Sequence, residues 1–449
     1  MPRLAGTSDL VAATPPVVLA GVGIVVSLWR PTAPDVGAVW TGLDEFPAEL
    51  ASAIAAYRGP AVVVGTLAMV VVAIVPLLVA LTPLGRRGLG RLATLGQGRT
   101  GTGAAAARGA AIAVAVSLAV DLAVLPLGVW AGLVHNGDWG LRTASAGLWW
   151  RDRLLGIGVS ALLAAVAGAA LVLAVRRWPR TWHWHLVTIG TVAVAALTVL
   201  WPVVVEPLFV PEVELDDPRF EAAVDEVLDG VGLADLPVVV AQSSTRSSLV
   251  NAAVVGLGPS RRVVLHDTLL ERPLDEVVAV VAHEVAHERN RDVERAVVAS
   301  AIGLLAMALV LRRVWDDERV RARLGATQVG DPRVVVAGAV VLALLTPLGQ
   351  PVAFWQSRRV EAAADAASLD LGADPATIVR LQRRLAIDNL SPMERPTWQV
   401  IFLRTHPSPG ERIRAAVAVA ERDGLPLPDV TTLEAEEAAD PPAWQQPTG

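Results

Sequence analysis

The sequence predicts a mainly α-helical membrane protein, a multi-pass bundle of about seven spans that carries a small α+β domain. Three observations support this prediction. The 449 residues are 53% hydrophobic with a mean hydropathy of +0.50, and only 18% are charged, against about 25% in ordinary soluble proteins. Seven apolar stretches are each long enough, at about 20 residues, to cross a bilayer. A more polar region with helix and strand patterns begins after residue 205.

The first apolar stretch lacks a strongly charged leading segment and a clear cleavage site before Arg30, so we interpret it as a retained span rather than a signal peptide. Asp121 lies within the third stretch, where a carboxyl group either lines a polar cavity or bonds to a neighbouring helix. The seven predicted spans have their cores at residues 11–29, 60–82, 109–134, 155–175, 184–205, 294–312 and 333–353.

The region after residue 205 predicts a compact α+β unit. Its turns are marked by glycine and proline, and its strands by β-branched runs. An aspartate followed by proline is a typical helix start, and glycine is a typical stop. The expected elements are a helix from Asp217 and Pro218 to Gly230, a strand at 238–241, a hairpin formed by 249–255 and 262–266, and a helix over 275–293.

The last of these helices contains His-Glu-x-x-His at His283, Glu284 and His287. Residues four apart lie on one face of a helix, so both imidazoles can bind one zinc ion. Glu284 lies beside the pair, where a carboxylate can take a proton from metal-activated water. The alternatives are a solvated pair or two core histidines. The chain has only seven histidines, and apolar residues surround the motif, which favours the metal site.

A zinc hydrolase needs a third protein ligand, and Glu361 is the candidate. The alanine-rich run around it predicts a helix with Glu361 and Asp365 on one face, so Asp365 can accept the outer N–H of a ligating histidine. About 25 residues lead from His287 to the end of the sixth span, and about 28 from the start of the seventh span to Glu361. Both legs are roughly 40 Å long. An antiparallel pair of spans therefore returns Glu361 to the level of His287.

His406 and Arg412 flank a proline-containing turn and can donate hydrogen bonds to a developing oxyanion. A lone histidine beside prolines is otherwise a turn residue. The composition excludes other chemistry. The chain has no cysteine, which excludes disulfides and thiol catalysis, and its net charge of −6 gives no case for nucleic-acid binding.

These motifs, in this order, resemble the type I CAAX prenyl protease family, integral-membrane zinc metallopeptidases related to the HtpX quality-control proteases. The resemblance is most specific over about 200–290 and 355–415, and the family also has seven spans. The segments that carry it are Glu206-Pro207-Leu208-Phe209, Arg246-Ser247-Ser248-Leu249-Val250-Asn251-Ala252, Gly256-Leu257-Gly258, Val264-Leu265-His266-Asp267-Thr268-Leu269-Leu270, His283-Glu284-x-x-His287, Glu361-x-x-x-Asp365 and His406-Pro407.

The resemblance implies a zincin-like catalytic domain with one Zn²⁺ per chain, whose ligands are His283, His287 and Glu361. Glu284 is then the general base, and Asp365 supports a ligand from behind.

The resemblance also implies that Asn251 and Ala252 lie on an edge strand that holds an extended peptide by strand addition. His406 and Arg412 are implied to approach the scissile carbonyl. Glu288 departs from the pattern, since the family often has tryptophan there, which bears on substrate preference and leaves the zinc chemistry untouched.

We therefore expect a membrane-embedded zinc metalloendopeptidase that hydrolyses membrane-associated or lipid-modified proteins. The alternatives are a quality-control protease for damaged membrane proteins and a non-catalytic zinc-binding scaffold or sensor. The expected parts are a membrane domain of five spans at 1–205, an α+β catalytic segment at 206–293, two spans at 294–353, a helical catalytic segment at 354–425 and a disordered acidic tail at 426–449.

The expected location is a multi-pass position in a bilayer, the plasma membrane for a bacterial source, which the absence of lysine and the richness in alanine and valine suggest. The expected partners are the lipid bilayer and a peptide or membrane-protein substrate. The family places its catalytic segments on the cytosolic side. Arginines in short loops cluster at 83–108, 176–183 and 313–332, opposite the predicted zinc site. Either the active site faces outward, or one of the seven stretches does not span.

Overall fold

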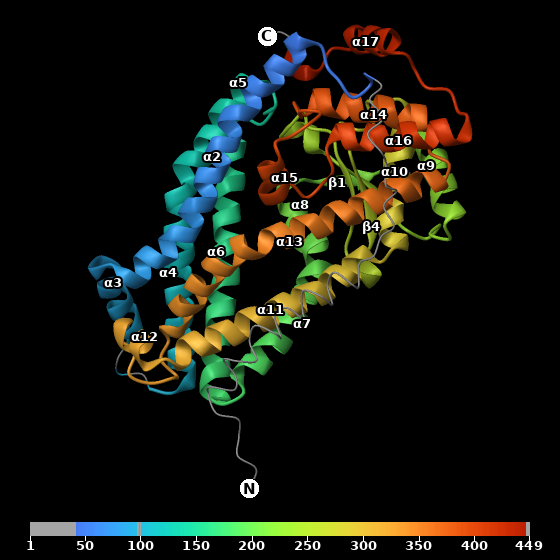
Figure 1. The fold of residues 1–449 in the computed structure, drawn as a ribbon. Helices are drawn as coiled ribbons and strands as arrows, with labels where there is room; N and C mark the ends of the chain where they lie inside the picture. The colour runs from blue at the N-terminus through green and yellow to red at the C-terminus, as the bar shows by residue number, and fades with distance from the viewer. Residues whose placement is uncertain (1–41, 97, 99, 446–449) are drawn as a thin grey trace.

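The computed structural model describes residues 42–445 apart from 97 and 99, so the predicted first span lies outside the described residues. Long helices form a bundle at one side of the molecule, and the sheet with its covering helices lies at the other (Figure 1). The helices outside the sheet region are α2 (Ala48–Leu81), α3 (Pro83–Ala93), α4 (Thr102–Val129), α5 (Asn136–Asp138), α6 (Ala146–Arg177), α7 (Trp182–Leu200), α8 (Glu206–Phe209), α11 (Asp292–Asp316), α12 (Glu318–Arg323) and α13 (Val334–Asp370).

Six helical stretches among the described residues are long and apolar enough to cross a membrane. They match all six predicted spans that fall within the described part of the chain, to within one residue where a predicted core runs past a helix end, which confirms those predictions. Most of their apolar side chains are not buried inside the protein, as expected for helices that face lipid. The six are Ala48–Leu81, Thr102–Asp138, Ala146–Arg177, Trp182–Phe209, Asp292–Asp316 and Val334–Asp370.

Small residues allow α4 and α6 to approach closely. A Cβ added to Gly168 would lie 2.6 Å from Cβ of Ala113 and 2.7 Å from the carbonyl oxygen of Gly109. Glycine therefore permits backbone contact between two helices that have no hydrophobic drive to associate in lipid. Farther along the same pair, a carboxylate oxygen of Asp121 lies 3.9 Å from a guanidinium nitrogen of Arg153, which gives this intramembrane carboxylate an ionic partner on the neighbouring helix.

The α+β unit matches its sequence prediction closely. Asp217 caps α9, and the predicted hairpin forms as β3 and β4. The four-stranded sheet has the order β1-β2-β4-β3, with β2 and β4 parallel and the other pairs antiparallel, so β3 is an edge strand of the described sheet. The bounds are β1 (Glu212–Glu214), α9 (Pro218–Gly230), β2 (Val238–Ala241), β3 (Ala252–Val255), β4 (Arg262–His266) and α10 (Leu274–Arg289).

Helix α10 packs on this sheet through Val277, Val281 and Val285, which are fully buried in one core cluster. The predicted single helix over 275–293 is wrong at its end. Helix α10 stops at Arg289, Arg291 adopts the left-handed conformation with φ 54°, and α11 starts at Asp292. A residue other than glycine is uncommon in the left-handed region, and at Arg291 this conformation separates α10 from α11.

Helices α11 and α13 lie side by side and are joined through α12 (Figure 1). Helix α13 continues for 37 residues, through Pro347 and Pro351, out of the apolar region and into the catalytic end. The predicted antiparallel return of Glu361 to the level of His287 is confirmed, because ligand atoms of both residues lie within one group that spans less than 4.8 Å.

Of the C-terminal helices, α14 packs against α10. The acidic tail, which the sequence predicts to be disordered, is ordered over its described residues. Residues 426–445 are not disordered, since Val430–Ala439 form helix α17 with Leu433 only 1% exposed. Arg383, fully buried, bonds both oxygens of Glu437, which fastens α17 to α14. The remaining helices are α14 (Pro375–Asp388), α15 (Thr397–Leu403) and α16 (Pro409–Asp423).

Candidate metal centre

The two histidines of the motif face one another across one turn of α10. Nε2 of His283 lies 3.3 Å from Nε2 of His287, and the ring planes are nearly perpendicular. The buried valines of α10 face the sheet and fix the rotation of the helix, so the histidine face turns toward α13.

Glu361 approaches this pair from α13. One carboxylate oxygen lies 3.3 Å from Nε2 of His283, and the other lies 3.7 Å from Nε2 of His287. A tetrahedral zinc with bonds of 2.0–2.1 Å would hold its ligand atoms about 3.3–3.4 Å apart. Oε2 of Glu361 is buried and has no hydrogen-bond partner among the described residues. The three residues therefore fit a metal ion both in spacing and in unused coordinating capacity.

Each histidine has a carboxylate behind it. Nδ1 of His283 lies 3.0 Å from Asp365, as the sequence predicts, and Nδ1 of His287 lies 2.9 Å from Asp292. When each Nδ1 carries the proton, each Nε2 presents a lone pair to the shared space. Asp292 was missed by the sequence reasoning. The sequence shows an aspartate five residues after His287, but it does not show the turn at Arg291 that directs this aspartate back to the site.

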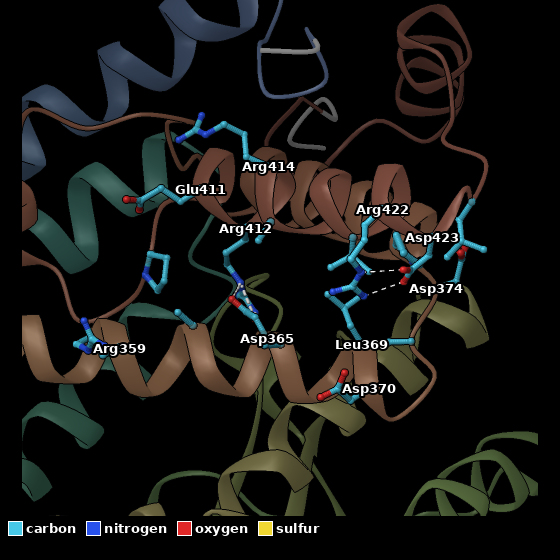
Figure 2. A pocket seen from close by; sticks show the side chains of 18 of the residues that line it. Arg359, Asp365, Leu369, Asp370, Asp374, Glu411, Arg412, Arg414, Arg422 and Asp423 are labelled. Carbon is cyan, nitrogen blue, oxygen red and sulfur yellow. Dashed lines mark hydrogen bonds and ion pairs between the residues drawn. The ribbon is translucent and has the colours of Figure 1, made fainter. Parts of the chain in front are cut away.

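Arg412 reaches the site from α16 (Figure 2). Its Nε lies 3.0 and 2.9 Å from the two oxygens of Asp365, and its Nη2 bonds the same carboxylate. Nη2 also lies 3.4 Å from Nδ1 of His283. Two of its three guanidinium nitrogens thus contact the carboxylate of Asp365 behind His283, whereas the sequence predicts a donor to the oxyanion.

Glu284 lies against the edge strand. Its Oε2 accepts a hydrogen bond of 3.2 Å from the backbone N–H of Val254 in β3. Asn251 and Ala252, the predicted peptide-binding residues, line a small cavity of about 140 Å³ together with Glu284 and His283. The edge strand and the motif helix therefore form adjacent walls of one site.

His406 lies at the exposed side of the site. Its Nε2 is 3.3 Å from Glu361, its Nδ1 is 2.8 Å from the hydroxyl of Thr405, and 61% of its side chain is accessible to solvent. Glu288, where the sequence departs from the family pattern, is buried and ion-paired with Arg261, the residue just before β4.

The site electrostatically favours a cation. Burial lowers the pKa of His283, but Asp365 and Glu361 outweigh burial and raise that pKa to about 9. The two carboxylates around the imidazole favour a positive charge at this place, which either a proton on the ring or a bound metal ion supplies.

A larger cavity of about 1140 Å³ leads from this site between α11 and α13. Glu284, His287 and Glu361 line its inner end, and apolar residues of the two helices line most of the rest.

The two halves of the chain match two family models. Residues 214–420 match peptidase family M48, and residues 59–210 match the CAAX prenyl protease N-terminal domain of five membrane helices. The chain belongs to peptidase family M48. This confirms the resemblance seen in the sequence and identifies a membrane-embedded metalloprotease with several spans.

Curated relatives of this M48 peptidase include CAAX prenyl protease 1 of Saccharomyces cerevisiae, 27% identical over 67% of this chain and 70% of the relative. An uncharacterized metalloprotease, YhfN of Bacillus subtilis, is 25% identical over 67% of this chain and 71% of its own. A protease HtpX homologue of Acidiphilium cryptum is 26% identical over 46% and 75%. The crystal structure of Saccharomyces mikatae Ste24p has the same fold, with a TM-score of 0.72 at 20% identity, and covers 92% of this chain and all of that one.

Proposed function

We propose that this M48 peptidase is a zinc metalloendopeptidase that uses His283, His287 and Glu361 as ligands. The observation that carries the proposal is that coordinating atoms of the three residues lie within 4.8 Å of one another. Nε2 of His283 is 3.3 Å from Nε2 of His287 and 3.3 Å from Oε2 of Glu361, a buried oxygen with no hydrogen-bond partner among the described residues. A bound zinc ion supplies a Lewis acid that polarises the peptide carbonyl and lowers the pKa of water toward about 7.

Glu284 acts as the general base. It takes a proton from the attacking water and returns it to the leaving amine. Its contact with the N–H of Val254 supports this assignment, because the bond holds the carboxylate beside the strand on which the peptide would lie.

His406 and Arg412 take different parts. His406 is exposed, with Nε2 beside Glu361, and by turning Nε2 from Glu361 toward the substrate it donates a hydrogen bond to the oxyanion that develops on the scissile carbonyl. Arg412 acts as a positioning residue through Asp365, which orients His283.

The substrate is an extended segment of a membrane-associated or lipid-modified protein. The outer edge of β3, which begins at Ala252, has no partner strand in the described sheet and is open to strand addition, and Asn251 directly precedes this edge. The cavity between α11 and α13 supports a substrate that arrives from the membrane, because it connects the site with the apolar part of the bundle.

A quality-control role on damaged membrane proteins is the second candidate. It is supported by the volume of the same cavity, about 1140 Å³, and by the similarity to a protease HtpX homologue. A non-catalytic scaffold would need no base at Glu284.

The proposal is tested by zinc analysis and cleavage assays on the detergent-purified protein. We expect one zinc per chain and cleavage of peptides, and the Glu284→Gln variant should retain zinc and lose cleavage. Turnover by that variant would remove Glu284 from the mechanism. Faster cleavage of a prenylated peptide than of an unfolded membrane protein supports the first substrate class, and the reverse supports quality control.

A further inference from the structure

A glutamine on α13 holds two buried polar atoms that lack a partner. Gln356 is 4% exposed, and neither Nε2 nor Oε1 has a hydrogen-bond partner in the part of the chain that the structure describes. Buried side-chain amides are normally satisfied, because an unmet donor or acceptor destabilises the folded state. A partner from outside the chain would remove this defect.

Gln356 lines the large cavity between α11 and α13. It precedes Glu361 by five residues, so the two lie about 7.5 Å apart along the helix axis and about 140° apart around it, and both line this cavity. An extended peptide covers that distance in about two residues. The cavity is bounded elsewhere by residues 251–254 at the edge of β3, so Gln356 and the edge strand face the same space.

A peptide bound along the edge of β3 has backbone N–H and C=O groups on its far side that also need hydrogen-bond partners. In strand addition, alternate residues direct their N–H and C=O groups toward the neighbouring strand. The intervening residues direct theirs away, which in an apolar cavity leaves them unpaired. A carboxamide offers one acceptor and a donor group, which complement the C=O and N–H of a single residue.

We propose that Gln356 binds the main chain of the substrate, on the side away from β3 and about two residues from the scissile bond. This inference rests on the proposed peptidase function. A change of rotamer about the side chain's three torsions moves the amide from the wall into the cavity. Both hydrogen bonds go to the backbone of the substrate, so Gln356 fixes the register of the peptide along β3 without selecting for a particular substrate side chain. It disfavours proline or an N-methylated residue at that one position.

The test uses binding in the Glu284→Gln background, where the peptide stays intact. The probe is a fluorescein-labelled decapeptide selected from a random mixture because the unmodified protein cleaves it. Gln356→Leu should weaken binding roughly 10-fold or more. Gln350→Leu is the matched control, a glutamine on the same helix that lines the same cavity, and it should change binding less than about twofold.

Derivatives of the probe with one N-methyl group each provide the second readout. One position should weaken binding to the Gln356 protein and have no further effect on Gln356→Leu. The thermal midpoint of Gln356→Leu should equal or exceed that of the parent, because the substitution removes two unsatisfied atoms. A lowered midpoint would assign Gln356 a structural partner and overturn the inference.

Unchanged binding by Gln356→Leu overturns the inference and leaves the peptidase proposal standing, since the probe is itself a cleaved peptide. Failure of the unmodified protein to cleave any peptide of the mixture removes the proposed function, and the inference with it.

Discussion

Asp292, the first residue of α11, lies 2.9 Å from Nδ1 of His287, near the end of α10. The left-handed turn at Arg291 makes this contact between two helices possible. The Asp292 carboxylate fixes the tautomer of His287 and so presents Nε2 as a ligand.

Asp292→Asn should therefore lower zinc affinity 10- to 100-fold or so while the protein still folds. Competition with a fluorescent chelator measures the change. Asp316→Asn, at the far end of the same helix, is the control and should bind zinc normally. Equal affinities for the two variants would exclude Asp292 from the metal centre.

Glu361→Gln and Glu284→Gln separate metal binding from proton transfer. Both variants should lose peptide cleavage, but only Glu361→Gln should lose zinc, because the two carboxylate oxygens of Glu361 lie 3.3 Å from Nε2 of His283 and 3.7 Å from Nε2 of His287. Metal analysis of the purified variants measures the difference. Retention of a full zinc complement by Glu361→Gln would contradict the ligand assignment.

Arg412→Leu should destabilise the protein by about 3 kcal/mol, because it leaves the Asp365 carboxylate without its guanidinium partner. The double variant Arg412→Leu/Asp365→Asn should recover part of this loss. Thermal midpoints in detergent and zinc affinities of Arg412→Leu, Asp365→Asn and the double variant give the coupling between the two side chains. A variant that keeps both stability and zinc affinity but loses cleavage would instead place Arg412 on the substrate.

Gly168→Ala should weaken the α4–α6 contact by about 1–3 kcal/mol, because the new methyl group overlaps Ala113 and a carbonyl of α4. Gly156→Ala, on the same helix, is the control, since a Cβ there meets nothing within 4 Å. A thermal midpoint that falls in both variants would indicate a general effect of alanine rather than close packing.

Glu276 should make the catalytic unit less stable as pH rises. Burial raises its pKa to about 7, while Arg384 and Arg272 lower it less strongly. Between the ordinary glutamate pKa of about 4.5 and 7, the unfolded chain releases this proton before the folded chain does. The free energy of unfolding therefore falls as pH rises through that window, and the loss is complete above pH 7.

Glu276→Gln should flatten the fall in thermal midpoint between pH 5 and pH 8, whereas the exposed Glu271→Gln should not. Identical pH profiles for Glu276→Gln and the unmodified protein would refute the buried-carboxyl explanation.

The amino-acid sequence predicted the six spans within the described residues, the hairpin and the approach of Glu361 to His283 and His287, because their spacings follow from local geometry. His283 and His287 lie one helical turn apart whatever surrounds them. The segment from His287 to the end of the sixth span and the segment from the start of the seventh span to Glu361 are of similar length, so Glu361 returns to the same level.

Other features depended on contacts between distant segments. Arg412 pairs with Asp365, and α17 is ordered because buried Arg383 binds Glu437 and Leu433 enters the core.

The sequence by itself determined that this chain crosses a membrane repeatedly and carries a paired-histidine motif on a helix. Only the tertiary structure decided that Asp292 supports His287 and that Gln356 lines the cavity without a hydrogen-bond partner among the residues described. The physical reason is that hydrophobicity and helical period are local properties. The direction of a side chain between elements depends on turns such as Arg291 and on packing, which no local pattern specifies.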